Sequence, residues 1–140
     1  MLEVGQSIES GTAALTTADC VAFAQSFDPQ PMHVDHNAAE DSFFGQLVAS
    51  GWHVLSATIR LVVDARPFGE HPLIGAEIKE IRFARPVEPD TVIRARVTLQ
   101  EILPRSAGGN FALLLVETLD DGSGDVLVKQ GWKMLLEDKE

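Results

Sequence analysis

SGWHVLSATIRLVVDA, residues 50 to 65, is the stretch from which the architecture of this chain can be worked out. Apolar residues recur in it so often that they leave very little polar face: Trp52, Val54, Leu55, Ala57, Ile59, Leu61, Val62 and Val63. A helix of this composition is expected to be buried nearly all round. Because it is too short to cross a membrane, we expect the rest of the chain to wrap it.

Alternating apolar and polar residues predict strands in the second half of the chain. Between residues 91 and 100 every second residue is apolar, as in a strand with one face on a core. Residues 111 to 116 are continuously apolar, which is typical of a central strand. The segment DDGSGD, residues 120 to 125, predicts a turn, and residues 126 to 134 alternate again. These last segments together predict a hairpin.

Two further strands are expected, at residues 76 to 83 and at residues 4 to 9. In the first of them the alternation slips at Glu80, which predicts a β-bulge there. A long apolar helix followed by an antiparallel sheet of about five strands gives an α+β protein in which the sheet curls around the buried helix, an arrangement known as the hot-dog fold. We expect a single domain over residues 1 to 140. One helix in one sheet leaves open strand edges, so we also expect a homodimer or higher homo-oligomer.

The segment before residue 50 shows helical signals interrupted by prolines. Thr16 or Thr17 can cap a helix that ends near Phe27. The prolines within residues 28 to 31 disfavour a helix and favour an extended or turned loop. A second short helix is expected over residues 35 to 41, with the first of these as its N-cap.

The charge of the chain narrows the classes of partner. With a formal net charge of −10 and scattered Lys and Arg, the chain lacks the clustered cations that a nucleic-acid partner requires. Arg82 and Arg85 remain candidates for holding a phosphate, with solvated surface charge as the alternative.

No secretory signal and no membrane span is recognisable, so we expect a soluble, cytoplasmic protein. The single cysteine, Cys20, is expected to pack in the core.

Ionisable residues gather in one otherwise apolar segment, FDPQPMHVDH, residues 27 to 36. Asp28 and His33 lie on either side of its two prolines, which stiffen the backbone between them and hold the two side chains in a fixed relation at low entropic cost. That suits a catalytic pair, although such residues are also common in plain turns and solvated loops. Asp35 and His36 are expected to begin the next helix and face solvent.

Residues 28 to 33, Asp-Pro-Gln-Pro-Met-His, resemble the signature of the MaoC-like enoyl-CoA hydratases, also called R-specific hydratases: an Asp, any residue, an Asn, a Pro, an aliphatic residue and a His. The resemblance continues in the family's order through Ala38-Ala39, Phe44-Gly45, Ala49-Ser50-Gly51, residues 81 to 87 (IRFARPV) and Asp90-Thr91. It implies a hydro-lyase of fatty acid metabolism that acts on a 2-enoyl or 3-hydroxyacyl thioester of coenzyme A.

Three positions depart from the family pattern. Phe27 stands where a Gly commonly precedes the Asp, Gln30 replaces the Asn, and the usual Pro-Gly-Asp turn is shortened to Pro89-Asp90. Gln30 keeps an amide that can orient the loop by hydrogen bonds. We therefore expect the catalytic pair to survive and the acyl preference to change.

The resemblance implies that Asp28 and His33 act on one water. Asp28 is expected to polarise that water as a base, and His33 to orient it and pass a proton to C2 of the substrate. The enolate oxygen that develops needs hydrogen-bond donors, and the first turn of the long helix has free backbone N–H groups. We expect the Gly51 amide to be the oxyanion donor with Ser50 as the helix cap; a plain N-cap with a glycine for packing is the alternative.

The surroundings of this pair leave two choices open. Phe43, Phe44 and Trp52 are candidates for lining an acyl pocket, with core packing as the other use of such residues.

We expect no metal, because Pro31 occupies the position where a metallohydrolase motif has a histidine, and no cofactor besides the coenzyme A of the substrate. Two other functions remain, an acyl-CoA thioesterase of the same fold and a noncatalytic acyl-thioester-binding subunit.

Overall fold

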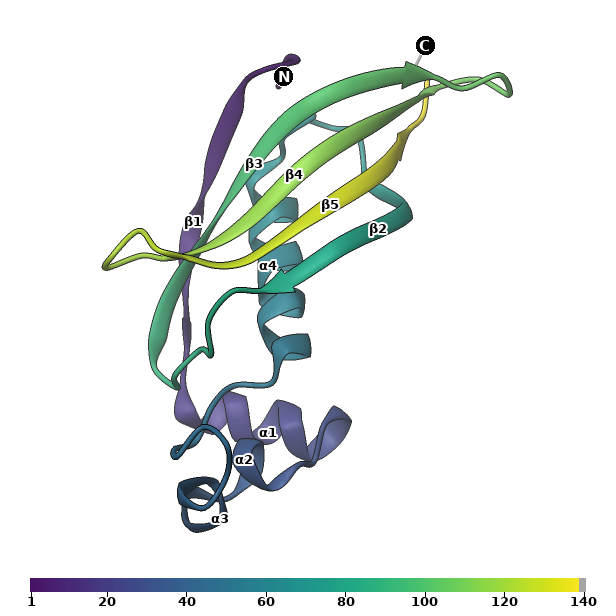
Figure 1. Ribbon diagram of the computed structural model, residues 1–140. Coiled ribbons are helices and arrows are strands. Elements are labelled where there is room, and N and C mark those ends of the chain that lie inside the picture. Colours follow the sequence, from purple (N-terminus) through teal and green to yellow (C-terminus); the bar gives the residue numbers. More distant parts are fainter. Residues whose placement is uncertain (139–140) are drawn as a thin grey trace.

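The computed structural model describes residues 1 to 138, in which a five-stranded antiparallel sheet curls around one long helix (Figure 1). The elements follow one another as β1 (Ser7–Leu15), α1 (Thr17–Phe27), α2 (Pro31–Val34), α3 (His36–Glu40), α4 (Gly51–Ala65), β2 (Ile74–Phe83), β3 (Thr91–Pro104), β4 (Asn110–Asp120) and β5 (Val126–Leu136). The strands lie in the order β1-β3-β4-β5-β2, so β1 and β2 form the edges. This is the hot-dog arrangement predicted from the sequence.

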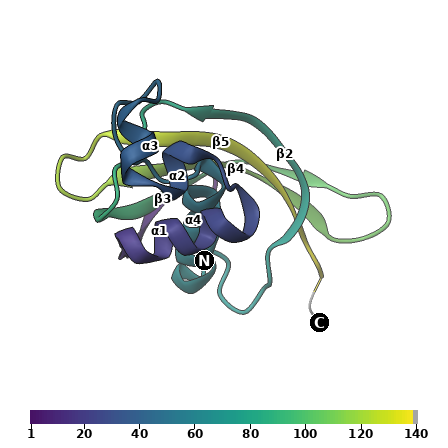
Figure 2. The ribbon, with the colours of Figure 1, turned by 90° about the horizontal axis from the view of Figure 1, so that it is seen from below.

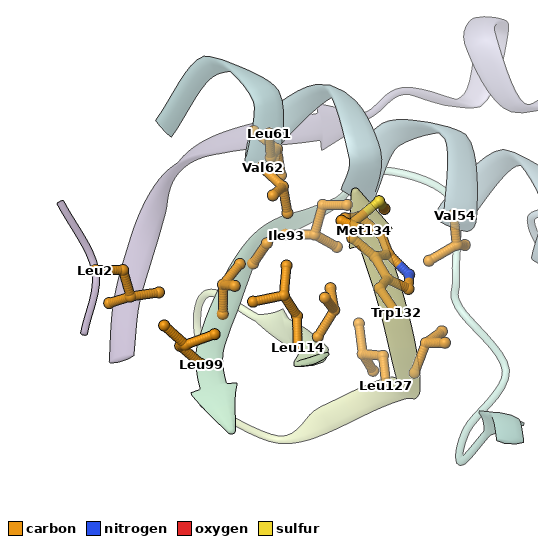
Figure 3. Packing of buried hydrophobic residues seen from close by; sticks show 14 of the residues in the cluster. Leu2, Val54, Leu61, Val62, Ile93, Leu99, Leu114, Leu127, Trp132 and Met134 are labelled. Carbon is orange, nitrogen blue, oxygen red and sulfur yellow. The ribbon is translucent and has the colours of Figure 1, made fainter. Parts of the chain in front are cut away.

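The core lies between α4 and the concave face of the sheet. The helix turns one row of side chains inward, at the spacing of one helical face: Val54, Thr58, Leu61 and Val62. In Figure 3, Leu61 and Val62 point from α4 into the cluster that includes Leu114 of the central strand. Every second residue from Ile93 to Leu99 joins this cluster, as the alternation in the sequence predicted.

The prediction that α4 is buried nearly all round is wrong for the single chain. Trp52, Ile59 and Val63 are 62%, 38% and 50% exposed. They lie along one side of the helix, and the physical reason is that one sheet covers only the opposite side. This leaves an apolar strip open on the molecule.

β2 is an exposed edge strand with an irregular ladder to β5. Between Lys79 and Arg82 the register shifts by one residue, and Glu80 has a φ of 55°. The predicted bulge at Glu80 is therefore confirmed. The predicted turn at residues 120 to 125 is also confirmed, because it joins β4 to β5 in an antiparallel hairpin.

The N-terminal strand is displaced from its predicted position. It covers Ser7–Leu15 and not residues 4 to 9, because its partner is β3, whose ladder pairs Ser7 with Thr98 and Leu15 with Thr91. The polar sequence of this edge strand carries little alternation of its own. Its length is set by the neighbouring strand.

Three short helices gather at the N-terminal end of α4 (Figures 1 and 2). α1 begins after Thr16, whose hydroxyl accepts a hydrogen bond from the Asp19 amide, and it ends at Phe27 as predicted. The loop predicted around the prolines is partly wrong, because Pro31 begins the single-turn helix α2. Proline is tolerated there, since the first residue of a helix has no intrahelical use for its N–H.

Within residues 1 to 138, no helix combines the length and the apolar character needed to cross a membrane.

Candidate active site

Asp28 and His33 come together at the end of the molecule where α1, α2 and α4 meet. Asp28 caps the C-terminus of α1, and His33 lies in α2 rather than on the loop that the prolines predicted. His33 Nε2 lies 3.4 Å from Asp28 Oδ2, and the two side chains are only 8% and 16% exposed. A carboxylate and an imidazole are therefore held at close range and largely out of bulk water.

His33 is oriented by a backbone carbonyl. Its Nδ1 lies 2.7 Å from the Val48 oxygen, and a carbonyl can only accept, so Nδ1 carries the hydrogen. The Val48 amide in turn donates to the Met32 carbonyl at 3.0 Å, which ties α2 to the segment before α4. This leaves Nε2 as the nitrogen that faces Asp28 and can exchange a proton with substrate or water.

Both oxygens of Asp28 accept hydrogen bonds. Gln30 Nε2 donates to Oδ1 at 2.6 Å, and Ser50 Oγ donates to Oδ2 at 2.7 Å. Burial raises the pKa of Asp28, but the hydrogen bonds from Gln30 and Ser50, with His33 nearby, outweigh burial and hold the pKa below its ordinary value. The carboxylate is thus kept ionised, and each oxygen retains lone-pair capacity for a water.

The first turn of α4 lies directly beside this carboxylate. Ser50 is its N-cap, as predicted, and accepts from the Trp52 amide at 3.2 Å. The His53 and Val54 amides both reach the Ser50 carbonyl, whereas the Gly51 amide takes part in none of the hydrogen bonds found among residues 1 to 138. A free N–H at the positive end of a helix is suited to an oxyanion.

Gly51 also has a packing contact. A Cβ built on it would lie 2.6 Å from Cε1 of Phe83, whose ring rests on the glycine from the end of β2. The packing role that the sequence left as an alternative is therefore real. It does not compete with the oxyanion role, because the N–H is unaffected by it.

These groups line one cavity of about 470 Å³, hereafter the Asp28–His33 cavity. The three aromatic candidates, Phe43, Phe44 and Trp52, all line it, together with Phe83 and Arg85. Phe43 is 98% exposed, so core packing does not explain it. The cavity thus brings together every residue that the sequence put forward for the site except Ser50, which stands behind Asp28.

The remaining candidate residues lie elsewhere. Asp35 caps α3 by accepting from the Asn37 and Ala38 amides, and His36 is exposed, both as predicted. Cys20 is fully buried, and burial raises the pKa of its thiol to about 11. In the part of the chain that the structure describes, no three His, Cys, Asp or Glu side chains converge as a metal ion needs.

Two elements of the site were missed at the level of sequence. The Val48 carbonyl is a backbone group, and the identity of Val48 carries no signal for it. Phe83 is an apolar residue at the end of an edge strand and reads as ordinary packing. The contact with Gly51 could be found only in three dimensions.

Comparison with known proteins gives a consistent result. The family model of the MaoC like domain matches residues 2–112. The MaoC-like dehydratase from Rhodospirillum rubrum has a similar structure, with a TM-score of 0.91 and 32% identity over 99% of this chain and 95% of that one. Protein MaoC of Klebsiella aerogenes is 37% identical over 99 residues, which are 69% of this chain but only 29% of that longer protein.

A more distant likeness concerns the fold. The R-hydratase PhaJ1 from Pseudomonas aeruginosa superposes with a TM-score of 0.80 at 22% identity, over 99% of this chain and 84% of that one. The family model spans well over half of the sequence, from β1 to the start of β4. The chain therefore belongs to the MaoC-like dehydratase family and has the hot-dog fold.

Proposed function

We propose that this protein adds water to a 2-enoyl thioester, or removes it from the 3-hydroxyacyl thioester, with Asp28 and His33 as the acid–base pair. The observation that supports this best is the approach of His33 Nε2 to Asp28 Oδ2 at 3.4 Å in a cavity beside the free Gly51 amide. Family membership supports the same class of reaction. We take coenzyme A as the carrier of the acyl group.

The proposed reaction uses one water and one shared proton. Asp28 removes a proton from the water as its oxygen bonds to C3, and the electrons of the double bond move towards the thioester carbonyl. The proton then passes from Asp28 to His33 Nε2, which carries no hydrogen while Nδ1 does, and Nε2 delivers it to C2. This restores the pair, and dehydration runs the same steps backwards.

The proposed oxyanion donor is the Gly51 amide. Negative charge develops on the thioester oxygen as C3 is attacked, and a preorganised N–H at a helix N-terminus stabilises it without reorganisation. Ser50 couples the two halves of the site, because it caps α4 and also donates to Asp28. One residue thus relates the position of the base to that of the oxyanion donor.

The test is hydration of crotonyl-CoA, followed by loss of the absorbance of its conjugated double bond and, in parallel, by release of free thiol. We expect Asp28→Asn and His33→Gln each to lower kcat/KM at least about a hundredfold, the usual scale for acid–base groups. Asp35→Asn and His36→Gln are matched controls in the next turn, outside the cavity, and should retain activity. Thiol release with an intact double bond would instead identify a thioesterase, and inactivity across a panel of chain lengths would identify a binding subunit.

We also propose that two copies of the chain pair over the open side of α4. Trp52 and Ile59 are exposed there, next to Ile78 and Ile81 of β2, and the space between them forms an apolar hollow of about 590 Å³. β2 is a sheet edge, and a free edge beside an apolar surface favours association. A second copy covers both features at once.

Sedimentation velocity tests the pairing. The wild-type chain should sediment as a dimer, and Ile59→Glu should shift it towards the monomer, because a charge is costly to bury in an apolar interface. Val92→Glu is the control, since Val92 is similarly exposed but lies on β3, away from this surface. A monomeric wild-type chain at micromolar concentration would contradict the proposal.

A further inference from the structure

The wall of the Asp28–His33 cavity contains one strong cation. Arg85 is the only Lys or Arg among the described residues that line this cavity. It follows the end of β2 by two residues. Arg85 also lines a second hollow of about 450 Å³ on the outside of the protein, together with Pro86 and Val87. It therefore stands where the cavity and the outer hollow meet.

The charge around Arg85 is otherwise negative. Glu88, Asp120 and Asp125 line the outer hollow, and the whole chain carries a formal charge of −10. A phosphate-bearing molecule that enters the cavity from this side is repelled by its surroundings except at Arg85. A specific cation is thus needed at this point if the thioester is carried by a phosphate-containing group.

The present partner of Arg85 is weakly held. Its Nη1 donates to Asp125 Oδ2 at 2.7 Å, and both side chains are about half exposed. An exposed pair of this kind contributes little to stability, so exchange of the carboxylate for another anion is easy. The planar guanidinium has five donors and matches a phosphate in a two-pronged geometry.

We propose that Arg85 binds the phosphate of the phosphopantetheine arm that carries the acyl thioester, with Asp125 as the competitor that this phosphate displaces. This phosphate is common to coenzyme A and to acyl-carrier proteins. The inference rests on the proposed function for the identity of the thioester and adds the residue that recognises its carrier. Arg82 is not an equivalent, because it does not line the cavity; in the β2–β5 ladder it stands opposite Lys129, which is exposed.

The kinetic test compares three crotonyl thioesters, those of coenzyme A, of phosphopantetheine and of N-acetylcysteamine, which has no phosphate. Arg85→Ala should raise KM about tenfold to hundredfold for the first two, the effect of losing a hydrogen bond between charged partners, and should leave kcat unchanged. KM for the N-acetylcysteamine ester should stay within about twofold. Asp125→Asn should lower KM for the coenzyme A ester severalfold, because it removes the competitor. Arg82→Ala is the control and should change none of these values by more than about twofold.

Three results would overturn the proposal: an equal change in KM for all three esters, no change for any, or a change confined to the coenzyme A ester. The wild-type KM for a crotonyl carrier protein, measured beside that of crotonyl-CoA, identifies which source of the phosphate the site prefers.

Binding of free coenzyme A, measured by titration calorimetry, separates this inference from the hydratase proposal. If the wild-type chain hydrates nothing but Arg85→Ala still weakens coenzyme A binding at least tenfold, the phosphate site stands and the hydratase falls. If hydration is observed and coenzyme A binding is the same in both proteins, the phosphate site falls and the hydratase stands. Thermal unfolding of Arg85→Ala should match the wild type, since the side chain is exposed.

Discussion

Ser50→Ala is expected to remove two hydrogen bonds made by one hydroxyl. One supports the base Asp28, and the other caps the N-terminus of α4. Ser50 Oγ donates to Asp28 Oδ2 at 2.7 Å and accepts from the Trp52 amide at 3.2 Å. A hydrogen bond to a charged group is worth about 1.5–3 kcal/mol, and loss of an N-cap costs about 1 kcal/mol. At neutral pH the free energy of unfolding should therefore fall by about 2–3 kcal/mol. The lost hydrogen bond to Asp28 should contribute no more than the lower end of its range, because water from the cavity replaces part of it.

The pH dependence identifies the contribution of Asp28. Its pKa in the folded chain is below the ordinary value, so its stabilising effect is present above the pKa of the unfolded chain and is lost as the pH falls through the folded pKa. The difference between wild type and Ser50→Ala, measured by urea denaturation, should shrink towards the N-cap contribution alone below about pH 4. In the hydration assay the acid limb of kcat/KM should move to higher pH, with about a tenfold loss of activity on that limb.

Thr16→Ala is the matched control for Ser50→Ala. Thr16 caps α1 through one hydrogen bond from the Asp19 amide at 3.1 Å and does not contact Asp28. It should cost about 1 kcal/mol of stability and leave the acid limb in place. If the two variants give the same pH profile, Ser50 does not tune the carboxylate, and the coupling of cap and base is refuted.

Three further experiments test side-chain packing. Gly51→Ala should lower the free energy of unfolding by about 1 kcal/mol or less, because its Cβ would lie 2.6 Å from Phe83 Cε1 but the Phe83 ring is 53% exposed and can turn aside; Phe83→Ala added to it should cost less than the sum of the single changes in urea denaturation. Thr58→Val should cost about 1–3 kcal/mol in the same assay, because it leaves the buried Thr118 hydroxyl, now 2.6 Å away, without its partner; Thr118→Val added to it should recover part of the loss. Cys20 should resist alkylation by iodoacetamide at pH 8 until the chain is unfolded, because burial raises the pKa of its thiol to about 11, and mass spectrometry of the labelled chain measures this.

The sequence was most informative where a local pattern sufficed. The limits of α4 follow from an apolar run that begins after a serine cap, and the β4–β5 turn follows from its glycines and aspartates. It was less informative where distant segments decide the outcome. The start of β1 depends on the length of β3, and the exposed side of α4 depends on how much of a helix one sheet can cover.

The same distinction holds for the site. Asp28 and His33 could be named because their residue types, with the prolines between them, form a motif. The fixed tautomer of His33 could not, because it depends on the carbonyl of Val48, a backbone group that every residue carries. Asp28 was expected to act as a base. Its support by Gln30 on one oxygen and Ser50 on the other could be found only in the three-dimensional structure.

The irregular pairing near Glu80 has a consequence for how relatives of this protein can differ in length. Three steps along β2, from Lys79 to Arg82, match two steps along β5, so β2 has one extra residue there without a partner on β5. Deletion of Glu80 would therefore keep Ile78 and Phe83 turned towards α4, whereas straightening the strand with Glu80 retained would turn Phe83 outward and Arg82 inward. A homologue shorter by this one residue can thus preserve the aromatic contact on Gly51, while a homologue that loses the irregularity and keeps the residue would present a positive charge to the oxyanion site.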